Sequence, residues 1–90
     1  MTMKLIDDII MTPMGDDWVA VPTGEASEVL HGIVRINATA KLLWDGLEQN
    51  LSEQELVKLL TDRYDVSEST AAQSVARILG ELKGAGLIED

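Results

Sequence analysis

The sequence predicts an α+β domain, in which a three-stranded antiparallel sheet at about residues 9–36 precedes three helices at about residues 37–85. Before residue 37, short β-branched runs alternate with Gly, Pro and Asp, which is typical of strands and turns. After it, apolar residues recur at helical spacing behind Ser or Asn. The run Ile33–Ile36 passes without a loop into Asn37, a good helix N-cap. Ninety residues are expected to form one domain, spanning 1–90.

Three strands are expected, at Ile9–Thr12, Trp18–Val21 and Ile33–Ile36. The first two are joined by a short turn-rich connection, and residues Ala26 to Gly32 lead to the third. Such connections favour an antiparallel meander, which places the third strand at an edge of the sheet. Pro13 cannot donate a ladder hydrogen bond, so the first strand should be the opposite edge or end there.

The helices are expected from Asn37 to about Gln49, after Ser52 and after Ser67. Ser52 and Glu55 have the spacing of a capping box, in which each side chain bonds the other residue's backbone N–H. The expected buried stripes are Ala40, Leu43, Trp44 and Leu47 in the first helix, Leu56, Leu59, Leu60 and Tyr64 in the second, and Ala71, Val75, Ile78 and Leu82 in the third. The end of the chain, Leu87-Ile88, should pack back on this core.

The edge strand is the predicted working surface. Val34 and Ile36 should face the core, while Ile33 and Arg35 should face outward. Natural proteins usually blunt open edges, because unpaired N–H and C=O groups invite pairing. This edge carries no proline and a single charge, so we expect an extended segment to pair with it.

A second candidate surface lies on the third helix, beside its core stripe. Its members are Ala72, Ala76, Leu79 and Lys83. Small residues let another backbone approach closely, so this flank could help to receive a peptide. The alternative is that the flank packs on the first helix or the sheet of the same domain.

Composition excludes several functions. The net charge is −9, with seven basic residues among sixteen acidic ones, so binding to nucleic acid or to an anionic membrane is disfavoured. There is no Cys, and His31 is the single histidine, so a zinc site of the usual kind cannot form. No phosphate-binding loop or paired catalytic acid and base is found. We therefore expect a non-enzymatic cytoplasmic protein without catalytic residues, metal or cofactor.

From about Ile9 to its end, the sequence closely resembles the PqqD-like proteins, also described as RiPP recognition elements. The matching segments are Val19 to Ala26, His31 to Ala40, Leu43-Trp44, Ser52-x-x-Glu55, Tyr64-Asp65-Val66 and Gly86-Leu87-Ile88. The sequence departs from the family pattern at Leu30-His31 and at Lys41-Leu42, where details of partner specificity would be set.

The resemblance implies a winged-helix-like domain that acts as a peptide chaperone. Such proteins bind the leader of a ribosomally made precursor peptide and present it to a modifying enzyme, commonly a radical S-adenosylmethionine enzyme. The leader adds a strand to the third strand and lies against the third helix. The peptide-binding residues are then expected to be Ile33, Val34, Arg35, Ile36, Ala72, Ala76, Leu79 and Lys83.

Three other functions remain open at this point. A winged-helix nucleic-acid-binding protein would share the fold, although the charge opposes it. An acidic carrier protein would need its attachment serine directly after Asp, whereas Ser67 follows Asp65-Val66. A homodimerisation module could use the same open edge, and the oligomeric state is left open.

Overall fold

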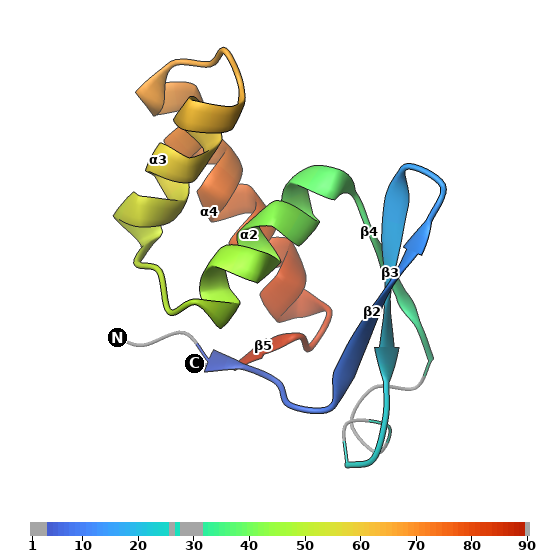
Figure 1. The fold of residues 1–90 in the computed structure, drawn as a ribbon. Coiled ribbons are helices and arrows are strands. Elements are labelled where there is room, and N and C mark those ends of the chain that lie inside the picture. The colour runs from blue at the N-terminus through green and yellow to red at the C-terminus, as the bar shows by residue number, and fades with distance from the viewer. Residues whose placement is uncertain (1–3, 26, 28–31, 90) are drawn as a thin grey trace.

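The computed structural model describes residues 4–25, 27 and 32–89, and within them the strands of the main sheet precede the helices (Figure 1). The sheet has the order β2-β3-β4 and is antiparallel throughout; β2 spans Ile9–Met14, β3 spans Asp17–Pro22 and β4 spans Val34–Ile36. The helices are α2 at Ala38–Glu48, α3 at Glu53–Arg63 and α4 at Glu68–Gly84. In Figure 1 they lie together beside the sheet. The predicted α+β class, with three antiparallel strands before three helices, is confirmed.

The sheet is the expected meander, with β4 at one edge and β2 at the other. A two-residue turn joins β2 to β3, and its Gly15 has a φ of 63°, which glycine adopts without a steric penalty. Pro13 does not end β2, since the strand continues to Met14 and Pro13 lies opposite Trp18. An edge strand tolerates a residue without an N–H. The connection from Ala26 to Gly32, with His31, lies largely outside the described residues.

All three helices begin at the predicted caps. The side chain of Asn37 accepts a hydrogen bond from the Ala40 N–H at 2.8 Å, and that of Ser67 accepts one from the Thr70 N–H at 3.1 Å. Ser52 and Glu55 form the full capping box, because each side chain accepts from the other backbone N–H. The bond from the Ser52 N–H lowers the pKa of the Glu55 carboxyl, since it favours the charged form.

The core is formed by the predicted stripes of the helices and by one face of the sheet. Its buried members are Ala20, Ile36, Ala40, Leu43, Trp44, Leu47, Leu56, Leu60, Ala71, Val75, Ile78, Leu79, Leu82, Leu87 and Ile88. Two residues of the expected α3 stripe are not in this core, since Leu59 is only half-buried and Tyr64 is 39% exposed. Tyr64 leaves the stripe because α3 ends at Arg63 and Tyr64 has extended backbone angles.

A second, two-stranded sheet was missed by the sequence analysis. β1 at Lys4–Leu5 pairs antiparallel with β5 at Ile88–Glu89, so the first and last described segments lie side by side (Figure 1). The Ile6 N–H extends this pairing by donating to the Leu87 carbonyl at 3.0 Å. Leu87 and Ile88 are buried, which confirms that the end of the chain packs back on the core.

Candidate functional site

β4 has one paired edge and one open edge within the described part of the chain. Its register with β3 sets Arg35 opposite Val19 and Ile36 opposite Trp18. The far edge of β4 has no described strand beside it, because β4 ends the sheet order. Every second residue of an edge strand presents an unpaired N–H and C=O. As far as residues 4–25, 27 and 32–89 are concerned, this edge of β4 is open, as the sequence predicted.

The side chains of this edge alternate as expected. Ile36 is 7% exposed and Val34 is partly buried against the core, whereas Ile33 is 62% exposed. Arg35 also faces outward, and its Nε donates to an Asp17 carboxylate oxygen at 2.9 Å. Since both partners are solvent-accessible, this ion pair orients Arg35 but contributes little stability.

A groove of about 180 Å³ lies between β4 and the C-terminal half of α4. It is lined by Val34, Arg35, Ile36, Asn37, Ala40, Ile78, Glu81, Leu82 and Ala85. Most of these residues are apolar, and Glu81 adds one carboxylate, which accepts a hydrogen bond from Arg77 at 3.1 Å. Ala40 and Ala85 have small side chains, so the groove has room for an apolar side chain of a ligand.

The α4 residues that were predicted to help bind a peptide are not those that line the groove beside β4. Ala72, Ala76 and Lys83 are exposed on α4, but none of them is among the described residues that line the groove beside β4. Leu79 is 5% exposed and lies in the core, so this member of the flank packs within the domain, which was the alternative expectation. The cause is the rotation of α4, which turns a different face towards β4.

Ile78, Glu81 and Leu82 line the groove from α4, and Ala85 lines it from the position that caps the end of α4. Sequence analysis assigned Ile78 and Leu82 to the core stripe and gave the other two no role. The four positions have the spacing i, i+3, i+4 and i+7, which places them on one face of the helix. This spacing could have indicated a shared helix face in the sequence. It does not indicate which part of the protein that face contacts.

The site combines an edge for main-chain pairing with a groove that is lined mostly by apolar residues. Among residues 4–25, 27 and 32–89, no three His, Cys, Asp or Glu side chains converge as metal ligands. Nor is any helix there sufficiently long and apolar to cross a membrane. An open edge beside apolar pockets is the geometry that binds an extended peptide, with affinity from the backbone and specificity from the pockets.

Two solved structures share this fold over nearly their whole length. One is the structure titled "Lasso peptide synthetase B1 complexed with the leader peptide", with a TM-score of 0.79, 20% identity and 100% of both chains covered. The other is titled "TbiB1 in Complex with the TbiA(beta) Leader Peptide", with a TM-score of 0.76, 20% identity, and 96% of this chain and 94% of that chain covered. At 20% sequence identity, this structural similarity shows that the fold is shared.

The family comparison identifies the chain more directly. No curated protein matches the chain. The model of the family described as coenzyme PQQ synthesis protein D (PqqD) matches residues 18–88, which include β3, β4 and all three described helices. The match extends over most of the chain and confirms the resemblance found in the sequence. This chain belongs to the PqqD family.

Proposed function

We propose that this chain binds the leader segment of a ribosomally made precursor peptide at the open edge of β4 and presents it to a modifying enzyme. The observation that carries the proposal is the open edge of β4 beside the apolar groove of α4. Both similar structures are complexes with a leader peptide, which supports the same class of ligand here. The PqqD family is non-catalytic, which agrees with a binding role.

The leader extends the sheet by pairing with Ile33–Ile36. Each main-chain hydrogen bond to this edge contributes about 0.5–1.5 kcal/mol net and is available to any extended peptide. An apolar side chain that enters the groove contributes about 1.5–3 kcal/mol and requires a suitable shape. The partly buried groove residues Val34 and Ala85 therefore help to select the leader, while the edge supplies affinity that depends little on sequence.

In this proposal the modifying enzyme that receives the leader is a radical S-adenosylmethionine enzyme, as the family resemblance implies. Its test is reconstitution: the enzyme encoded beside this gene is assayed on its precursor with and without the chain. We expect modification to depend on the chain, and to be lost when the leader is deleted from the precursor. Modification that proceeds equally without the chain would show that it does not present the leader.

The binding test is a titration of ¹⁵N-labelled chain with the leader of the precursor encoded nearby. We expect amide shifts at Val34–Ile36 and at Ile78–Ala85, with saturation at one leader per chain. A scrambled leader of the same composition is the control, since it retains the backbone and the charge. If the leader shifts α3 and leaves β4 unmoved, strand addition is wrong.

Two rivals are checked on the same sample. Random duplex DNA at low salt should give no shifts, because the net charge of −9 opposes phosphate binding. Sedimentation of the free chain shows whether a second copy occupies the edge instead. A dimer that the leader cannot dissociate would favour homodimerisation over leader binding.

A further inference from the structure

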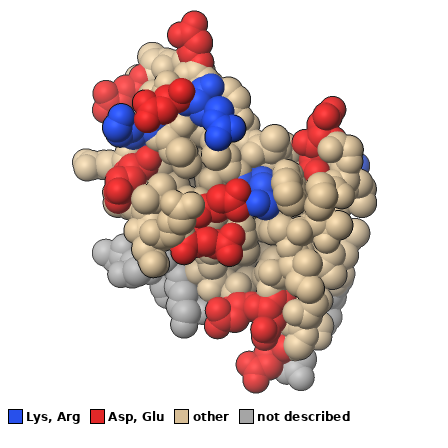
Figure 2. Space-filling model, in the orientation of Figure 1, with Lys and Arg blue, Asp and Glu red and all other residues tan. Residues whose placement is uncertain are grey.

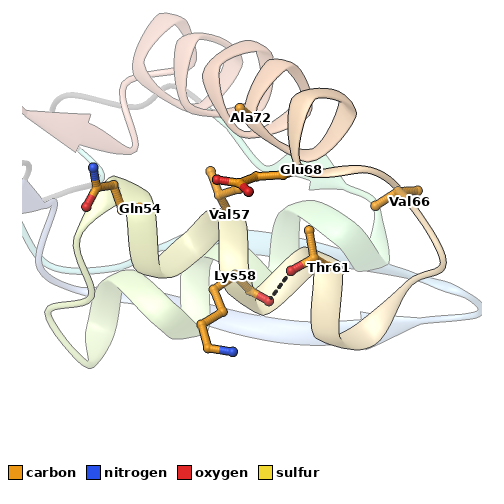
Figure 3. A pocket seen from close by; sticks show the side chains of 7 residues that line it. All are labelled: Gln54, Val57, Lys58, Thr61, Val66, Glu68 and Ala72. Atoms are coloured by element: carbon orange, nitrogen blue, oxygen red, sulfur yellow. Dashed lines mark hydrogen bonds between the residues drawn. The ribbon is translucent and has the colours of Figure 1, made fainter.

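A second pocket, of about 690 Å³, lies between α3 and α4 (Figure 3). It shares no lining residue with the groove beside β4. Val57, Lys58 and Thr61 line it from α3, and Glu68 and Ala72 line it from α4. It therefore borders the flank of small residues that the sequence analysis singled out, of which Ala72 is a member.

Three apolar residues, Val57, Val66 and Ala72, form one part of this pocket, and the other lining residues are Gln54, Lys58, Thr61 and Glu68. Val57 and Ala72 face it from the two helices, and Val66, which is 39% exposed, lies at one end (Figure 3). The hydroxyl of Thr61 donates to the Lys58 carbonyl at 3.0 Å, so this hydroxyl is already engaged and its methyl group is left to line the pocket. The apolar part of the pocket can therefore contact an apolar side chain of a ligand.

The charged group that lacks a partner at this pocket is negative. The Glu68 carboxylate extends over the pocket and has no hydrogen bond or ion pair with any residue the structure describes (Figure 3). Lys58 does not offset it, because its Nζ points away and lies 3.3 Å from an Asp62 carboxylate oxygen. Residues 53–68 carry five carboxylates and two cationic side chains. Figure 2 shows acidic groups spread over the visible face of the molecule.

We infer that this pocket receives an apolar side chain flanked by lysine or arginine from a partner protein other than the leader. Apolar side chains beside the unpaired Glu68 carboxylate are complementary to such a segment. A second copy of this chain is a poor occupant, since two molecules with a net charge of −9 repel each other. Because the pocket and the β4 groove share no residue, α4 can contact both ligands at once.

The probe is a capped pentapeptide with leucine between two lysines, titrated into the ¹⁵N-labelled full chain without leader. Two matched peptides are the controls: one has glutamates in place of the lysines, and one has glycine in place of leucine. We expect shifts at Val57–Thr61 and Val66–Ala72 with the lysine–leucine peptide alone. Binding should weaken in about 1 M salt, where the Debye length is about 3 Å.

Two variants locate the binding. Ala72→Trp fills the pocket and should lower the affinity for the probe peptide about tenfold, a change that titration measures easily. Ala76 lies one turn further along the same exposed flank and does not line the pocket. The Ala76→Trp variant should therefore bind the probe peptide with the affinity of the parent protein. Glu68→Gln removes the charge at nearly constant shape and should abolish the preference for lysine over glutamate.

Several results would overturn the inference. They are equal binding of the lysine and glutamate peptides, no binding of either, and equal weakening by the two tryptophan variants. A dimer that Ala72→Trp dissociates would make a second copy the occupant. None of these results depends on the leader, because the probe contains no leader sequence. Shifts confined to Val34–Ile36 would place the probe on the β4 edge and would also refute the second site.

Discussion

Proline substitutions in β4 give the sharpest test of leader binding by strand addition. The register sets Val34 opposite Ala20 and Arg35 opposite Val19, so Val34 and Arg35 are successive residues of one ladder. Their N–H groups therefore point to opposite sides of the strand, one towards β3 and one towards the open edge. Val34→Pro and Arg35→Pro each remove one N–H, and together they sample both sides.

The two variants differ in what the free protein loses. The variant on the β3 side breaks a ladder hydrogen bond and leaves a carbonyl of β3 unpaired, at a cost of about 1–3 kcal/mol in the free energy of unfolding. The variant on the open side breaks no internal bond. If it is Arg35→Pro, the further loss is the Asp17 ion pair, which is solvent-accessible and contributes about 0–1 kcal/mol.

The open-side variant should instead lose the leader. It removes one intermolecular hydrogen bond, and its ring obstructs the approach of the added strand, so we expect affinity to fall by about tenfold or more, equivalent to about 1.4 kcal/mol. Thermal unfolding and calorimetric titration of the same samples separate the two effects. Val34→Ala and Arg35→Ala keep the N–H and isolate the contribution of each side chain. If both proline variants stay folded and bind the leader as the parent does, strand addition at β4 is refuted.

Three further predictions concern the helices. Ser52→Ala should lower the free energy of unfolding by about 1 kcal/mol in urea titrations, because it leaves an N–H of α3 without its cap; unchanged unfolding would mean that water replaces the cap. Because the pKa of Glu55 is lowered in the folded state, its charged form stabilises the fold above the ordinary pKa of 4.5, and this stabilisation is lost as the pH falls through the lower folded pKa. Glu55→Gln keeps the hydrogen bond but does not titrate, so its melting temperature should fall less on acidification. Gly46→Ala would set a Cβ 2.6 Å from Leu56 Cδ2 and 3.2 Å from Leu51 Cδ1. Overpacking costs about 1–3 kcal/mol. This should outweigh the gain of about 1 kcal/mol in helix propensity, so we expect a lower melting temperature, and a higher one would show that Leu56 has room to rotate.

The sequence determined the elements whose causes are local. Asn37, Ser52 and Ser67 mark the starts of the helices because a cap needs one side chain and the N–H groups of the next turn. The buried stripes of α2 and α4 follow from helical periodicity. The order of the sheet follows from short connections, and the outward Arg35 and Ile33 follow from the alternation of a strand.

The tertiary structure decided what the helices and chain ends meet. Periodicity identifies the buried stripe of α4 but does not show that Glu81, and Ala85 after the helix, line a groove beside β4. The pairing of β1 with β5 joins two strands of two residues each, which are too short to show a period and too far apart in the chain for a local signal. The same reasoning applies to the pocket between α3 and α4, which exists because two helices pack with a particular rotation. Long-range packing sets that rotation, and no short segment of the sequence contains it.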